Sequence, residues 1–134
     1  MNIITIEPEW ISEEVAIAIH NRQLVEHGGG EGVRDMGLLQ SALARPQNAF
    51  HYNKVNSLAK LAACYGFGIA KNHAFIDGNK RTAYVVMLTF LFINGSTLNA
   101  TKEEKYLTMY AVASGDLNEE QLADWLESKL QQLI

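Results

Sequence analysis

The run from Ala83 to Ile93 is the feature of this 134-residue sequence that most restricts its fold. Apart from Tyr84 and Thr89, every residue in the run is apolar, so a helix here would have almost no polar face. A helix that is apolar on nearly every side belongs in the interior of a bundle. The run is also too short to cross a bilayer, which needs about 20 residues. The sequence therefore predicts an all-α fold, with about six helices around a central buried helix from about Asn79 to Ile93.

Local signals predict the helices around that central one. A side chain that can cap a helix N-terminus precedes each of them, and apolar residues recur behind it at helical spacing. The expected caps are Ser12, Asp35, Ser57, Thr101 and Asn118, the last two with the capping-box partners Glu104 and Gln121. The first helix should end at Gly28 to Gly30, where glycine can adopt a left-handed backbone. The second should stop before Pro46, which leaves Pro46 to Asn56 as an irregular connection.

Length and composition indicate one domain over residues 1–134 in a reducing, cytoplasmic setting. A chain of this size can bury one core. The 11 basic and 15 acidic residues give a formal charge of −4, so nothing in the overall charge favours direct binding of nucleic acid. Cys64 is the only cysteine and cannot form an internal disulfide. The N-terminus lacks the pattern of a secretion signal, and neither it nor the apolar run suggests contact with a membrane.

The segment from His73 to Ala83 gathers chemically useful groups where the central helix begins. The first turn of a helix has unpaired backbone N–H groups and partial positive charge, which make it a site for anions. Gly78 would let a phosphate approach the backbone closely, and Asn79, Lys80 and Arg81 add donors and two positive charges. Two cations at the positive end of a helix dipole are electrostatically unfavourable unless an anion binds there. The segment therefore predicts a phosphate site.

Asp77 and His73 complete the chemistry of this segment. Magnesium prefers oxygen ligands and often takes one carboxylate together with substrate phosphates and water, which suits Asp77. Histidine, with an ordinary pKa of about 6.5, is the side chain best suited to take a hydroxyl proton near neutral pH. His73 would be held in place if Phe75 is anchored in the core.

Each feature also has an ordinary structural explanation. A single loop histidine is usually solvated or structural, Asp-Gly is a common turn, Asn79 could serve as an N-cap, and Lys80 with Arg81 could form a solvated face. Their combination at the start of a buried helix favours the phosphate site. Two other glycine-rich stretches do not indicate a phosphate-binding site. Gly28 to Gly32 lacks the Lys-Ser/Thr of a P-loop, and Gly66-Phe67-Gly68 lacks the third glycine of a dinucleotide fingerprint.

The segment from His73 to Ala83 resembles the signature of the Fic/Doc (Fido) superfamily, in the form typical of its death-on-curing branch. Lys80 stands where Fic members have a second glycine, Tyr84 where they have a final arginine, and Ala74 where they have proline. The stretches from Gly28 to Pro46 and from Phe92 to Gly95 are also similar to death-on-curing proteins, so the resemblance covers most of the chain.

The resemblance implies a toxin of a toxin–antitoxin pair. Its activity would be transfer of the γ-phosphate of ATP, with Mg²⁺, to a Ser/Thr hydroxyl of a protein such as elongation factor Tu, which halts translation. Transfer of AMP, the usual Fic reaction, is the alternative, and a non-enzymatic module that binds an antitoxin is another. The roles implied are His73 as general base, Asp77 as Mg²⁺ ligand, Gly78 and Asn79 as anion cradle, and Lys80 and Arg81 as phosphate-binding, charge-stabilising groups.

The resemblance also implies two partner contacts. Fic-fold proteins dock an extended target segment on a flap, which we expect in the connection Pro46 to Asn56. They can also be inhibited by a helix carrying Ser/Thr-x-x-x-Glu-Gly/Asn. The nearest pattern here, Thr5 to Glu9, is followed by Trp10. Inhibition is therefore expected from a separate antitoxin that covers the site around Arg81.

Overall fold

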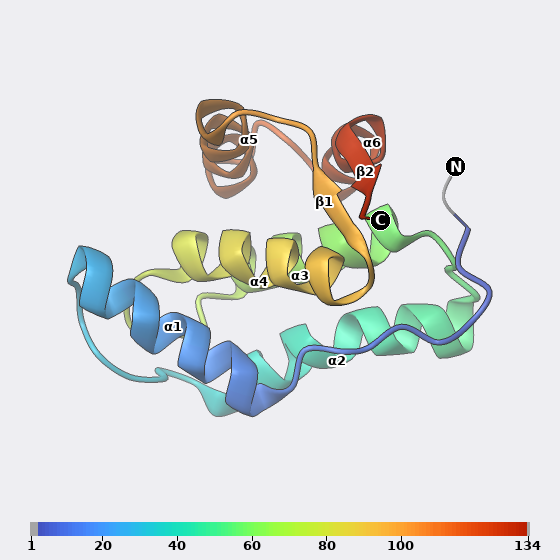
Figure 1. Ribbon diagram of the computed structural model, residues 1–134. Helices are drawn as coiled ribbons and strands as arrows, with labels where there is room; N and C mark the ends of the chain where they lie inside the picture. Colours follow the sequence, from blue (N-terminus) through green and yellow to red (C-terminus); the bar gives the residue numbers. More distant parts are fainter. Residues whose placement is uncertain (1–2, 134) are drawn as a thin grey trace.

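The computed structural model describes residues 3–133, which form six α-helices and one two-stranded antiparallel sheet (Figure 1). This architecture confirms the predicted all-α class with about six helices. The elements are α1 Glu13–His27, α2 Met36–Asn53, α3 Leu58–Asn72, α4 Asn79–Ile93, β1 Ser96–Leu98, α5 Lys102–Ser114, α6 Glu119–Lys129 and β2 Leu130–Gln132.

The helices form three layers (Figure 1). Helices α1 and α2 lie on one side, α3 and α4 run through the middle, and α5 and α6 lie on the other side. Helix α3 packs against α2, α4, α5 and α6, whereas α4 packs against α1, α3 and α5. The loop that carries the sequence motif joins these two middle helices.

The most deeply buried helix is α3, whereas the sequence favoured α4. Most of α3 is buried along its length, while α4 ends in the exposed side chains Phe92 and Ile93. Small residues allow this burial. A Cβ placed on Gly66 of α3 would lie 2.9 Å from Met87 Sδ of α4 and 3.6 Å from Leu122 Cδ2 of α6. Neighbouring helices can therefore approach α3 on several sides, and Gly66 serves helix packing.

The predicted N-caps are confirmed. In each case the side-chain oxygen of the cap accepts a hydrogen bond from a backbone N–H in the first helical turn. Both capping boxes are complete, with each partner side chain accepting from the backbone N–H of its cap. The five caps are Ser12, Asp35, Ser57, Thr101 and Asn118.

The predicted end of the second helix before Pro46 is wrong, because α2 continues through this proline to Asn53. A proline inside a helix removes one hydrogen bond and crowds the preceding turn, at a cost of about 3 kcal/mol. Packing offsets that cost here. Pro46 is buried, and Phe50, one turn later, packs edge-on against Trp10 with 5.7 Å between ring centroids. The second half of α2 is therefore fixed by tertiary contacts that the local sequence does not reveal.

The same finding removes the irregular backbone on which the expected target-docking role of Pro46 to Asn56 depended. Most of this segment is helical, so its backbone groups are already bonded within α2. The extended remainder is also occupied, since Asn56 O accepts a hydrogen bond from Ile4 N at 2.8 Å and Ser57 forms an antiparallel bridge with Ile3. An extended target segment would find little free backbone here.

The short sheet joins β1, which follows α4, to β2 near the end of the chain, with Leu98 opposite Leu130. No strand was expected from the sequence at either position. Within residues 3–133, no helix combines the length and apolar character that crossing a membrane would require.

Candidate functional site

The motif forms the tight connection between the two middle helices. Helix α3 ends at Asn72, His73 adopts a left-handed backbone (φ 52°, ψ 46°), and Gly78 is the N-cap of α4. The loop lines a pocket of about 340 Å³. Every site residue predicted from the sequence lines this pocket, which is formed by Ala70, His73, Ile76, Asp77, Gly78, Asn79, Lys80 and Arg81.

Phe75 anchors the loop in the core, as predicted. Its side chain is 1% exposed and stacks on the imidazole of His20 from α1, with 3.9 Å between ring centroids and 10° between ring planes. The backbone is fixed as well, because Phe75 forms an antiparallel bridge with Val33 and Ile76 N donates to Gly32 O at 3.1 Å. The loop is therefore held between α1 and the segment that precedes α2.

Arg34 fixes the backbone of His73. Its Nε and Nη2 both donate to His73 O, at 2.9 and 2.6 Å. The carbonyls at the end of a helix lack intrahelical partners and attract positive charge, so a guanidinium there stabilises the last turn of α3. The exposed imidazole of His73 consequently extends from a backbone that is held in one place.

The two carboxylate oxygens of Asp77 have different surroundings. Oδ1 accepts a hydrogen bond from Gly78 N at 2.7 Å. Oδ2 faces Gly29 so closely that a Cβ on that glycine would lie 2.7 Å from it. Asp77 is exposed, and a divalent ion bound there could use Oδ2 without breaking the bond to Gly78.

The N-terminus of α4 provides unpaired donors for an anion. Gly78 offers no side-chain cap, in contrast to the caps of the other five helices in the described chain. Arg81 adds a guanidinium whose Nε is buried without a hydrogen-bond partner and whose Nη2 makes one long bond of 3.4 Å to Gly28 O. An unpaired buried donor is costly, and a phosphate oxygen would satisfy it. The donor set thus fits a nucleotide phosphate with its magnesium.

The side chains of Asn79 and Lys80 contact other parts of the protein in a way that the sequence did not suggest. The Asn79 amide pairs with the Phe75 backbone, donating to its O at 2.9 Å and accepting from its N at 3.0 Å. Asn79 is therefore not the N-cap, and its side-chain amide is engaged with the loop backbone. The Lys80 ammonium lies over two rings of α5, 5.3 Å from the Tyr106 centroid and 4.7 Å from that of Tyr110.

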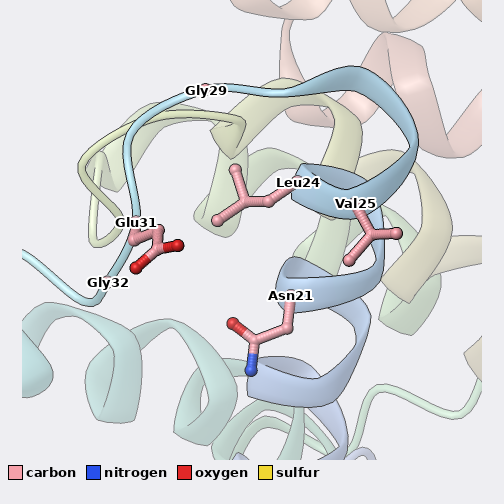
Figure 2. A pocket seen from close by; sticks show the side chains of 6 residues that line it. All are labelled: Asn21, Leu24, Val25, Gly29, Glu31 and Gly32. Atoms are coloured by element: carbon pink, nitrogen blue, oxygen red, sulfur yellow. The ribbon is translucent and has the colours of Figure 1, made fainter.

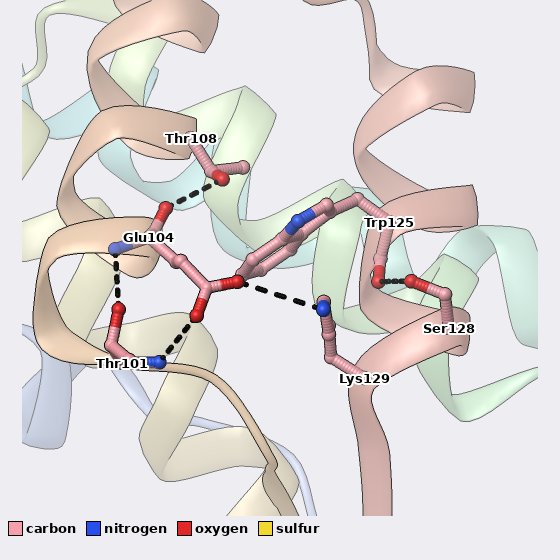
Figure 3. A network of polar contacts seen from close by, with 6 residues as sticks. All are labelled: Thr101, Glu104, Thr108, Trp125, Ser128 and Lys129. Atoms are coloured by element: carbon pink, nitrogen blue, oxygen red, sulfur yellow. Dashed lines mark hydrogen bonds and ion pairs between the residues drawn. The ribbon is translucent and has the colours of Figure 1, made fainter.

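Polar contacts cap the start of α5 and join it to α6 through one ion pair (Figure 3). Glu104 accepts from Thr101 N at 3.1 Å and forms an ion pair with Lys129 Nζ at 3.6 Å, while its own O accepts from Thr108 Oγ1. In α6, Ser128 Oγ donates to the carbonyl of Trp125. Helix α5 also carries the two tyrosines that meet Lys80.

The glycine-rich segment after α1 lies beside the motif. Gly29 and Gly32 of this segment, together with Leu24 and Val25 of α1 and other residues, line a hollow of about 550 Å³ (Figure 2). The sequence predicted only a helix stop here, which is confirmed by the end of α1 at His27. The structure adds a second role, because this loop and not Pro46 to Asn56 is the irregular segment next to the site.

Two departures from the Fic pattern also have structural explanations. Tyr84, at the place of the final Fic arginine, packs against the core, and burial raises its pKa. Glu9 is bound to Asn94, the C-cap of α4, through bonds of 2.8 and 3.0 Å. Since α4 has 15 residues and a helix rises about 1.5 Å per residue, Glu9 lies about 20 Å along the helix from the motif. It cannot pair with Arg81 in this fold.

Comparison with known proteins identifies the family. A model of the Fic/DOC family matches residues 10–91, which include the motif and the segments that hold it. The chain belongs to the Fic/DOC family. It is 34% identical to "Protein kinase doc" of Escherichia phage P1 over 116 residues, which cover 87% of this chain and 91% of that protein. It is 46% identical to "Toxin Doc" of Mycolicibacterium smegmatis over 77 residues, 57% of this chain and 59% of the relative.

Sequence reasoning missed three residues that shape the site of this Fic/DOC protein. Arg34 was noticed only as part of the family resemblance, and Gly29 only as part of a helix stop. His20 had one usable signal, because it lies on the same face of α1 as the buried residues Ala16 and Gln23. All three act across the fold, which is why the motif alone does not reveal them.

Proposed function

We propose that this protein is a death-on-curing toxin that transfers the γ-phosphate of ATP to a Ser/Thr hydroxyl of a target protein in the cytoplasm. Elongation factor Tu is the candidate target, and loss of translation would be the result. The observation that carries the proposal is the pocket in which His73, Asp77 and the uncapped start of α4 meet the unpaired Nε of Arg81. The names of the two relatives, a protein kinase and a toxin, support the same proposal.

The positions of these groups support the following reaction. His73 would take the proton of the target hydroxyl as its oxygen attacks the γ-phosphorus. The bond from that phosphorus to the bridging oxygen would break, and ADP would leave. Magnesium held by Asp77 would offset phosphate charge, and Arg81 with the backbone N–H groups from Asn79 onward would stabilise the transferring group. Lys80 would contribute charge from its place beside α5.

Labelled ATP tests the transferred group. The protein is incubated with elongation factor Tu, Mg²⁺ and ATP radiolabelled at either the γ- or the α-phosphate. We expect label on the target from γ-labelled ATP alone. Label from α-labelled ATP would instead assign AMP transfer to the same site. Absence of label with either nucleotide would refute modification of this target and favour a module that only binds an antitoxin.

The proposed inhibitor is a separate antitoxin that covers the site around Arg81. The support is that Glu9, in the segment most similar to a Fic inhibitory motif, is bound at the far end of α4. A co-purifying antitoxin should abolish transfer and should protect the pocket from Mg-ATP. Full transfer by the complex would contradict this assignment.

A further inference from the structure

His20 is buried beneath the motif but is not part of it. Its side chain lies on α1, is 1% exposed, and stacks face to face on Phe75. Its Nε2 lies 2.8 Å from Asp77 O. Because a carbonyl oxygen can only accept, Nε2 carries the proton and donates it to this bond. A ring enclosed in this way cannot reach a target hydroxyl, so its role concerns the loop.

The peptide between Asp77 and Gly78 is held at both ends. His20 binds its oxygen, and its N–H donates to Asp77 Oδ1 at 2.7 Å. Gly78 has φ of +76°, a conformation that glycine adopts without strain, and its peptide could rotate easily if nothing fixed it. The ring of His20 also lies against this glycine, since a Cβ there would be 3.8 Å from Cδ2 and Nε2.

The orientation of this peptide determines the orientation of the carboxylate. With the N–H directed at Oδ1, the carboxylate is fixed and Oδ2 remains available beside Gly29. A rotated peptide would present its carbonyl oxygen to the carboxylate, and two acceptors repel each other. We infer that His20 is a positioning residue that sets the Asp77 carboxylate for a divalent cation. The inference rests on the proposed use of Mg-ATP at this site.

Two substitutions separate the hydrogen bond from the ring. His20→Phe keeps an aromatic ring against Phe75 and removes the donor, whereas His20→Gln keeps a donor and removes the ring. His27→Gln, at the exposed end of the same helix, is the matched control. The first readout needs no ligand: hydrogen exchange of the Gly78 amide by NMR. The second is calorimetric binding of ATP with and without Mg²⁺.

In the parent protein we expect the Gly78 amide to be protected from hydrogen exchange. In His20→Phe this amide should exchange about tenfold faster, which corresponds to the loss of a hydrogen bond worth roughly 1.4 kcal/mol. The same variant should lose about tenfold in the Mg²⁺-dependent part of ATP affinity and little in binding without metal. His20→Gln and His27→Gln should stay near the parent. An unprotected Gly78 amide in the parent, or a larger loss in His20→Gln than in His20→Phe, would overturn the inference. Protection without any Mg²⁺-dependent binding by the parent would overturn the proposed function, and with it the purpose assigned to His20.

Discussion

The left-handed backbone of His73 leads to an unusual prediction about stability. With φ of 52° and ψ of 46°, this non-glycine residue costs about 1–2 kcal/mol, a strain that glycine does not carry. Glycine loses about 0.4–1 kcal/mol through its freer unfolded chain. The balance favours His73→Gly over His73→Ala by about 1 kcal/mol, or about 4 °C in melting temperature for a domain of this size. Both variants should fail to modify the target.

Thermal unfolding of the two variants, monitored by circular dichroism, measures this difference. The neighbouring pair Asn72→Gly and Asn72→Ala is the control, because Asn72 is still helical and alanine should be the more stable there by about 0.5–1 kcal/mol. Greater stability of the alanine variant than of the glycine variant at both positions would refute this prediction. Such a result would mean that the chain does not turn at His73 as described.

Two further outcomes follow from the structure. Gly29→Ala should weaken Mg-ATP binding more than Gly28→Ala, measured by calorimetry, because both glycines have positive φ but only at Gly29 does a Cβ meet the Asp77 carboxylate; equal losses would argue against that contact. Burial raises the pKa of Cys64 to about 11 and of Tyr65 to about 12. As the pH rises, the unfolded chain loses the Cys64 and Tyr65 protons at a lower pH than the folded protein does. The free energy of unfolding should therefore have its full value below pH 9 and should fall as the pH approaches 12. Urea unfolding should show a shallower fall in a C64A/Y65F double variant; an unchanged fall would count against burial as the cause.

The parts of the fold that the sequence predicted are those governed by neighbours along the chain. A capping side chain acts on N–H groups two or three residues ahead, so all five predicted caps were recoverable. The parts that were missed depend on distant contacts. Pro46 remains inside α2 because of packing in its second half, and the β1–β2 pair joins segments separated by two helices.

The candidate site follows the same division. The chemical groups are contiguous from His73 to Arg81, so the pattern predicted where they would meet. Their individual states were not predictable, because Lys80 faces α5 and the Asn79 amide faces the loop backbone. The support from Arg34 and His20 comes from residues 39 and 57 positions away in the chain.

The most direct test of the account is an intact mass spectrum of elongation factor Tu after incubation with this protein, ATP and Mg²⁺, compared with the same reaction by His73→Ala. We expect a gain of one phosphoryl group that is absent with the variant. A gain of AMP would contradict the assigned reaction while keeping the site, and a phosphoryl gain that persists in His73→Ala would contradict the assignment of His73 as the base.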